Sequence, residues 1–182
     1  MGKRVAILAT SGFEESELFE PKKALEKSGA EVIIIAPEKG FIKAWNHGNW
    51  SKSIGVDVTV EDAIIDDYDA LVIPGGVINP DKLRRDQKAV DFVRRFFESN
   101  KLVASICHGP QMLIEAEVVK GRTMTSFSSI KKDLINAGAN WANEKVVMDD
   151  NLVTSRSPED LEAFNGKIIE ELSKVEAAAS HR

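Results

Sequence analysis

The segment LVASICHGP, residues 102–110, is an apolar run that ends at a cysteine and a glycine–proline turn. The run Leu102–Ile106 is short and mostly apolar, which predicts a strand buried on both faces. Proline is favoured in the first turn of a helix, so a short helix is predicted over Gly109–Ala116. Cys107 is the only cysteine of the chain and falls between these two elements.

Strands and helices alternate in the same way along much of the chain. Further buried strands are predicted at Arg4–Ala9, Glu31–Ala36 and Asp69–Ile73, and amphipathic helices at Ser16–Ser28 and Lys88–Ser99. Such an alternation gives right-handed βαβ units and a parallel sheet that is covered on both faces. The sequence therefore predicts an α/β protein, a three-layer α/β/α sandwich with a mainly parallel sheet.

Residues 1–182 are predicted to form one domain, because a chain of this length suits a single core. Residues 173–182 are expected to be a frayed tail. The other predicted elements are a small peripheral hairpin (Phe41–Trp45 with Val56–Val60), a strand (Thr123–Thr125), a helix (Ile130–Ala137), a strand pair (Lys145–Met148 with Leu152–Thr154) and a final helix (Pro158–Leu172).

The composition is that of an ordinary globular protein, with 43% apolar and 29% charged residues. The net charge of −5 argues against nucleic acid or an anionic membrane as the main partner. No apolar stretch approaches the roughly 20 residues of a membrane span. A single cysteine cannot form an internal disulfide, so the expected location is the cytoplasm.

Three strand ends carry residues that are suited to chemistry. In a parallel sheet the carboxyl ends of the strands share one edge, and ligands bind there. The turns that follow the first, third and fourth predicted strands would bring together three carboxylates, two glycine amides, a thiol and an imidazole, which belong to Glu14, Glu15, Glu17, Gly75, Gly76, Cys107 and His108.

Each of these features also has a purely structural interpretation. Acidic residues stabilise a helix N-terminus, a Gly-Gly pair can be a plain turn, and an isolated cysteine is often an inert core residue. Their coincidence at one edge favours a reactive site instead. Cys107 would be a nucleophile whose pKa is lowered by the helix N-terminus and by His108. The amides of Gly75, Gly76 and His108 would face an oxyanion, and a carboxyl group of the acidic turn would move a proton.

The three histidines, His47, His108 and His181, narrow the reaction type. Triads of the glutamine amidotransferase type place a histidine downstream in an H-x-E motif, and here only His181 lies downstream, in the tail. Glutaminase chemistry is therefore not expected. The scattered histidines and single cysteine show no metal-ligand spacing, and no phosphate-binding glycine motif occurs, so neither a metal nor a nucleotide cofactor is predicted.

Five segments together identify a family resemblance: GFEESE (12–17), DALVIPGG (69–76), ASICHGPQ (104–111), INAGA (135–139) and LVTSRSPEDL (152–161). With these motifs the chain resembles the PfpI family, of the intracellular protease I and general stress protein type, within the superfamily of the Parkinsonism-associated deglycase. The resemblance covers about residues 3–172. It implies a flavodoxin-like sandwich with Cys107 on a strained nucleophile elbow, and Glu17 hydrogen-bonded to the sulfur.

The resemblance also implies a homo-oligomer, a dimer or a hexamer. In the PfpI type an acidic residue from a neighbouring subunit completes a Cys-His-acid triad. The matching region is Asn79–Arg84, which makes Asp81 the candidate partner of His108. Archaeal members have glutamate at this position, and aspartate is shorter by one methylene.

Several functions remain open from the sequence. The first is a cysteine-dependent stress-response hydrolase acting on peptides, or on glyoxal-derived or glycated carbonyl groups as a deglycase or glyoxalase would. Peptide hydrolysis also needs a general acid for the leaving amine, which His108 would supply. The alternative is a non-catalytic redox-sensing or chaperone-like stress protein whose Cys107 is oxidised. A scaffold with an inert cysteine is the third interpretation.

Overall fold

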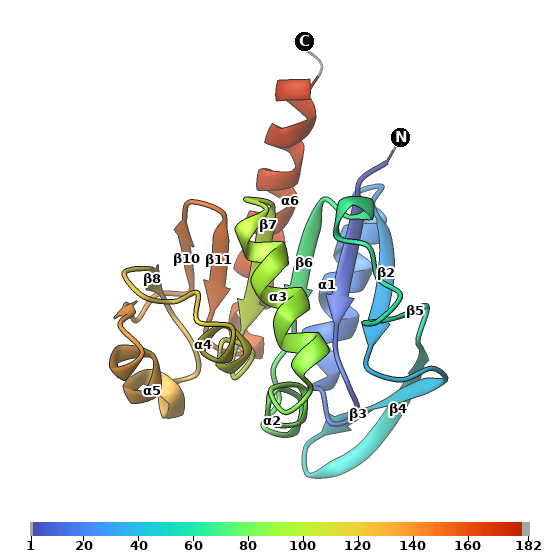
Figure 1. Cartoon of the computed structure of the whole chain (residues 1–182), viewed down its shortest axis with the longest axis horizontal. Coiled ribbons are helices and arrows are strands. Elements are labelled where there is room, and N and C mark those ends of the chain that lie inside the picture. Colours follow the sequence, from blue (N-terminus) through green and yellow to red (C-terminus); the bar gives the residue numbers. More distant parts are fainter. Residues whose placement is uncertain (1, 180–182) are drawn as a thin grey trace.

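A seven-stranded sheet forms the centre of the computed structural model, which describes residues 2–179 (Figure 1). The strands lie in the order β10-β11-β7-β6-β1-β2-β5. All neighbouring strands run parallel except β10 and β11, so the predicted mainly parallel sheet is confirmed. The strand bounds are Arg4–Leu8 (β1), Glu31–Ala36 (β2), Val58–Thr59 (β5), Ala70–Ile73 (β6), Leu102–Ile106 (β7), Val146–Asp149 (β10) and Leu152–Ser155 (β11).

Helices cover both faces of this sheet (Figure 1). Alternate strand residues point to opposite faces, so Val5 and Ile7 pack with α1 (Glu15–Lys27) and α6 (Leu161–Ala179). On the other face Ala6, Leu8 and their neighbours pack with α3 (Gln87–Glu98) and α4 (Gln111–Glu115). The predicted three-layer sandwich is thereby confirmed. None of the helices within residues 2–179 combines the length and the apolar character needed to cross a membrane.

Smaller elements surround the sheet. They are α2 (Ile78–Leu83), α5 (Lys131–Asn136), the parallel pair β8 (Thr123–Met124) with β9 (Asn140–Trp141), and the 3₁₀ turns η1 (Ile65–Asp67), η2 (Ser128–Ile130) and η3 (Pro158–Asp160). Three of these elements, α2, β9 and η1, have no counterpart among the predicted elements.

The peripheral hairpin exists, but its second strand differs from the prediction. β3 (Phe41–Asn46) pairs in antiparallel fashion with β4 (Asn49–Gly55). The predicted second strand, Val56–Val60, is wrong, because that stretch contains β5, which pairs with β2 in the main sheet. His47 and Gly48 form the tight turn, with φ angles of 47° and 81°. Most side chains of β4 are exposed or half-buried and polar, so β4 lacks the alternation that marks a strand.

The final helix is longer than predicted. A 3₁₀ turn replaces the predicted helix start at Pro158, and α6 continues past Leu172 to Ala179. Lys167 and Lys174 form ion pairs with Glu170 and Glu171 on successive turns, at 2.7–3.2 Å, which supports the extension. Residues 173–179, predicted as part of a frayed tail, are therefore helical. The rest of that tail, with His181, lies outside the described residues.

The topology brings the three predicted turns to one edge of the sheet. β7, β6 and β1 are consecutive neighbours and all parallel, so their carboxyl ends lie side by side. In Figure 1 this edge lies at the bottom, near α2 and the β3–β4 hairpin, whereas both chain ends lie at the top. The candidate site is built at this edge.

Candidate active site

Cys107 occupies a strained turn directly after β7. Its φ of 62° lies in the left-handed region, which is uncommon for a residue other than glycine. Two backbone hydrogen bonds hold the turn: Cys107 N donates to Ser155 O at 3.0 Å, and Phe127 N donates to Cys107 O at 2.9 Å. The cysteine is free and only 6% exposed. This geometry agrees with the strained elbow that the family resemblance implies.

The two glycines after β6 allow the backbone to approach the elbow. A Cβ atom on Gly75 would lie 2.8 Å from His108 N and 2.9 Å from Cys107 Cβ, so only glycine fits there without movement. Gly76 has a φ of 83°. The N–H groups of Gly76 and His108 face the Cys107 sulfur closely enough to favour its thiolate form. These two amides can therefore stabilise negative charge next to the sulfur.

Gly75→Ala is expected to lower the free energy of unfolding by about 1–3 kcal/mol, because the added methyl overpacks the elbow. Urea unfolding followed by circular dichroism measures the change. Gly166→Ala serves as the control, since Gly166 lies exposed in α6 with open space around its missing side chain. That control should be neutral or stabilising by up to about 1 kcal/mol. Equal stability of Gly75→Ala and the wild type would contradict the close packing described here.

Glu17 is the buried acid of the site. It lies in the first turn of α1, is 0% exposed, and neither of its carboxyl oxygens has a hydrogen-bond partner of normal geometry within residues 2–179. Burial raises the pKa of Glu17 well above its ordinary value, and the charge of Glu14 raises it further. The nearby Cys107 sulfur and Gly75 N–H oppose the shift but do not cancel it. Glu17 therefore tends to keep its proton, beside the sulfur.

The predicted lowering of the Cys107 pKa is wrong for this environment. Burial raises the pKa of the thiol, and an ionised Glu17 would raise it further. The helix that was expected to favour the thiolate, α4, spans only Gln111–Glu115 and does not start at the cysteine, so its dipole contributes little. The thiol and the carboxyl group form a coupled pair. A thiolate forms more readily when Glu17 is protonated and when His108 accepts the thiol proton.

His108 lies between Cys107 and a residue that the sequence reasoning missed. Its Nδ1 is 3.3 Å from Cys107 Sγ, and its Nε2 is 3.1 Å from Ser129 Oγ. The imidazole stacks on Phe127, with 4.9 Å between ring centroids and 25° between ring planes. Burial lowers the pKa of His108, which favours the neutral ring. Ser129 and Phe127 come from the segment after β8, where the sequence carries no recognisable motif.

The other two carboxylates of the acidic turn have structural contacts. Glu14 caps α1, where its carboxylate accepts hydrogen bonds from Glu17 N at 2.9 Å and from the hydroxyl of Ser16. Glu15 accepts hydrogen bonds from Asn46 Nδ2 at 2.9 Å and Ser51 Oγ at 3.0 Å, which anchors the β3–β4 hairpin. Glu14 influences the site through the pKa of Glu17, whereas Glu15 is directed to the hairpin. Their prediction as pocket residues remains untested.

The α2 helix places Asp81 and a second residue that the sequence reasoning missed. Asp81 is exposed, and its predicted contact with His108 concerns another copy of the chain. Asn79 is fully buried: its Oδ1 accepts a hydrogen bond from Thr10 N at 2.8 Å, and its Nδ2 donates to Pro74 O at 2.9 Å. Asn79 therefore joins the turns after β1 and β6, which carry the acidic and glycine parts of the site.

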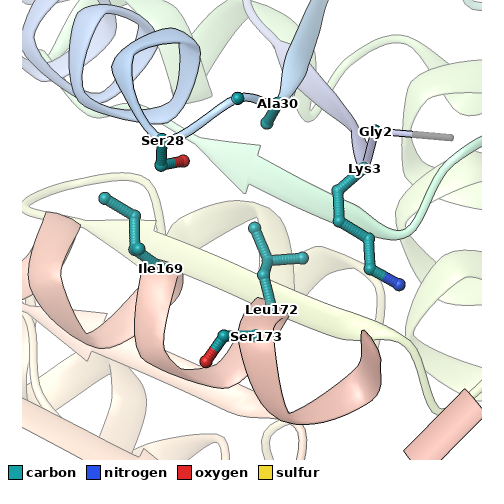
Figure 2. Close-up of a pocket in the computed structure, with 8 residues that line it drawn as sticks. Gly2, Lys3, Ser28, Ala30, Ile169, Leu172 and Ser173 are labelled. Carbon is teal, nitrogen blue, oxygen red and sulfur yellow. The ribbon is translucent and has the colours of Figure 1, made fainter. Parts of the chain in front are cut away.

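The cavity drawn in Figure 2 lies at the opposite edge of the molecule. It has a volume of about 180 Å³ and lies between the start of β1, the end of α1 and the middle turns of α6. Lys3, Ser28, Ile169 and Leu172 are among its lining residues, and no predicted site residue reaches it. Within residues 2–179, no three His, Cys, Asp or Glu side chains gather as metal ligands would.

Comparison with known proteins shows the family to which the chain belongs. A family model described as the DJ-1/PfpI family matches residues 3–171. The chain belongs to the DJ-1/PfpI family. The Bacillus subtilis protein named "Putative cysteine protease YraA" is 46% identical over 165 residues, which cover 91% of this chain and 95% of that protein. General stress protein 18 of the same organism is 43% identical over 175 residues, covering 96% and 100% of the two chains.

Solved structures of the DJ-1/PfpI family confirm the flavodoxin-like fold. Drosophila melanogaster DJ-1beta superposes with a TM-score of 0.86 at 28% identity, covering 100% of this chain and 97% of that one. A two-domain protein from Anabaena variabilis, which has DJ-1/ThiJ/PfpI-like and ferritin-like domains, gives a TM-score of 0.89 at 41% identity. That match covers 94% of this chain and 48% of the two-domain protein.

Proposed function

We propose that this member of the DJ-1/PfpI family is a cysteine-dependent stress-response hydrolase with Cys107 as its nucleophile. The observation that carries the proposal is the pairing of Cys107 on the strained elbow with His108, at 3.3 Å between Sγ and Nδ1. A nucleophile within reach of a base, with amides aimed at the same atom, is the arrangement used for acyl transfer. The names of the two Bacillus relatives, a cysteine protease and a stress protein, support it.

The proposed reaction uses only residues already placed at the site. The thiol proton moves to His108 Nδ1, and the thiolate attacks a substrate carbonyl carbon. The amides of Gly76 and His108 bind the oxyanion that forms. For a peptide, the nitrogen leaves with the proton held by His108, and water then hydrolyses the thioester. A protonated Glu17 opposes the thiolate less than an ionised Glu17 would, because it adds no negative charge beside the sulfur.

Turnover of a substrate panel tests this proposal and selects the substrate class. The panel contains chromogenic peptides, methylglyoxal and glycated amino acids, each assayed with the wild type and with Cys107→Ser. We expect turnover of peptides or of the carbonyl compounds that depends on Cys107. Absence of Cys107-dependent turnover across the whole panel would reject the hydrolase.

A second candidate function rests on the buried Glu17. Because neither of its carboxyl oxygens has another partner within the described chain, a protonated Glu17 can donate a hydrogen bond to an oxygen added to the sulfur. We propose, as the alternative, a redox sensor in which peroxide oxidises Cys107 to a sulfenic or sulfinic acid. Stoichiometric oxidation of Cys107 in intact-mass spectra, together with no turnover of the panel, would favour the sensor over the hydrolase.

We further propose that a second copy of the chain presents Asp81 to the imidazolium of His108. Exposed apolar residues next to α2 support a contact between copies: Val77 is 68% exposed, and Trp50, beneath Lys82, is 47% exposed. In such a homo-oligomer, Asp81 would stabilise the positive charge that His108 acquires during turnover.

Asp81→Ala is expected to lower the rate of peptide hydrolysis by about two- to fivefold, the effect of losing an exposed ion pair worth about 0.4–1 kcal/mol with the imidazolium. The alkylation rate of Cys107 should stay unchanged, because Asp81 acts after thiolate formation. Asp133→Ala, which removes an exposed carboxylate from α5, is the control. A hydrolysis rate equal to that of the wild type would remove Asp81 from the mechanism.

A further inference from the structure

His108 makes a second contact that the proposed mechanism does not use. Its Nε2 lies 3.1 Å from Ser129 Oγ, while its Nδ1 lies 3.3 Å from Cys107 Sγ. The three side chains thus form a continuous series from sulfur to imidazole to hydroxyl. All three belong to one chain, so the contact does not depend on a second copy. The orientation of a catalytic base by a third polar group is the general logic of catalytic triads.

Several contacts fix Ser129 relative to the imidazole. Ser129 lies in the 3₁₀ turn η2, where Ile130 N donates to Phe127 O at 3.2 Å. The turn is tied to the elbow, because Phe127 N donates to Cys107 O at 2.9 Å. The Phe127 ring stacks on His108 and sets the plane of the imidazole. None of these contacts involves the Ser129 hydroxyl. They therefore hold the hydroxyl next to Nε2 independently of its own hydrogen bond to His108.

The tautomer of His108 decides whether it can act as a base. A neutral imidazole carries one N–H, and its other nitrogen is an acceptor. Nδ1 can take the thiol proton only when the ring hydrogen is on Nε2. In that tautomer Nε2–H donates to Ser129 Oγ. After the proton transfer the imidazolium still donates from Nε2 to the same oxygen, so Ser129 serves both states without reorienting.

We infer that Ser129 is a positioning residue that accepts a hydrogen bond from Nε2 of His108 as the ring becomes an imidazolium, and thereby favours transfer of the Cys107 proton to Nδ1. The inference deepens the proposed hydrolase and rests on it for its biological purpose. In the step that it assists, the S–H bond breaks, an N–H bond forms at Nδ1, and the electron pair stays on sulfur. No further reactant is needed. Ser129 acts before substrate attack, in contrast to Asp81 of a second copy.

Three variants and two measurements test the role of Ser129 in the full chain. Ser129→Ala removes the hydroxyl, Ser129→Thr restores it, and Ser128→Ala alters the adjacent exposed serine of the same turn as a control. Nitrogen-15 spectra of His108 over a range of pH report the pKa of its ring. The alkylation rate of Cys107 by iodoacetamide reports thiolate formation. Ser129 is exposed, so thermal melting is expected to show that all three variants fold.

We expect the same His108 pKa in the wild type, in Ser129→Thr and in Ser128→Ala. In Ser129→Ala the pKa of His108 should fall by about one unit, and alkylation should slow by about tenfold, the loss expected for a hydrogen bond that stabilises a charged ring. An unchanged His108 pKa in Ser129→Ala overturns the inference, whatever the alkylation rate. A lowered pKa that Ser129→Thr does not repair also overturns it.

Neither measurement requires turnover, so the two proposals can fail separately. Cys107-dependent turnover with an unchanged His108 pKa in Ser129→Ala would reject only the role of Ser129. Absence of turnover with a His108 pKa that depends on Ser129 would reject only the hydrolase.

Discussion

Cys107→Ser is expected to lower kcat/KM for any substrate of the panel by at least about a thousandfold. Serine fits the same turn, but its hydroxyl is far harder to deprotonate than a thiol. The neutral, half-buried His108 offers only a modest base for that step. Initial rates over a range of substrate concentrations give kcat/KM, and thermal melting confirms that the variant folds.

A chemical control complements this substitution. Because Cys107 is the only cysteine, alkylation of the wild type with iodoacetamide modifies the same atom without changing the sequence. The alkylated protein should lose activity in proportion to the fraction modified. If Cys107→Ser retained more than about a tenth of the wild-type kcat/KM, the sulfur could not be the nucleophile.

Glu17→Gln is expected to stabilise the protein relative to the wild type by an amount that grows as the pH rises. Glu17 is fully buried, and burial raises its folded-state pKa well above the ordinary value of 4.5. At a pH below 4.5 the carboxyl group is protonated in both the folded and the unfolded state. At a pH between 4.5 and the folded-state pKa, Glu17 ionises in the unfolded state and keeps its proton in the folded state, so the wild type loses stability as the pH rises. Glutamine is neutral throughout and shows no such loss.

The size of the Glu17 effect follows from proton linkage. The stability gap between Glu17→Gln and the wild type should widen by up to about 1.4 kcal/mol per pH unit, until the pH reaches the folded-state pKa. Urea unfolding at about pH 4.5, 6 and 7.5 measures it. Glu20→Gln, an exposed position on the same helix, is the matched control and should give a nearly constant gap. A gap for Glu17→Gln that is independent of pH would contradict a buried, protonated Glu17.

The core strands could be predicted because their residues have one favourable environment. Glu31–Ala36 and Leu102–Ile106 are short, apolar and rich in β-branched residues, and their observed bounds equal the predicted ones. β4 could not be found in the same way, since both of its faces are largely exposed. The end of α6 was also misplaced. Val175 is the only large apolar residue of its last turns, and alanines together with ion pairs between neighbouring turns favour the helix there.

The meeting of the site residues could also be predicted from topology. Parallel neighbours β1, β6 and β7 force the turns with Glu17, Gly75 and Cys107 to one edge. Ser129 could not be predicted, because its place beside His108 depends on how the segment after β8 packs on the elbow. The direction of the Cys107 pKa was wrong, since the depth of burial of the thiol and of Glu17 is a tertiary property that local sequence does not encode.

The most direct test of the central claim, that Cys107 is a nucleophile, is the trapping of a covalent intermediate. An activated p-nitrophenyl ester of an acylated amino acid would be mixed with the protein, quenched in acid within milliseconds to seconds, and analysed by intact-mass and peptide-mapping mass spectrometry. We predict one acyl group per chain, bound to Cys107 through a thioester, which forms as p-nitrophenolate is released and decays at the rate of turnover. Steady turnover without an adduct on Cys107, or with the acyl group on another residue, would contradict the proposed mechanism.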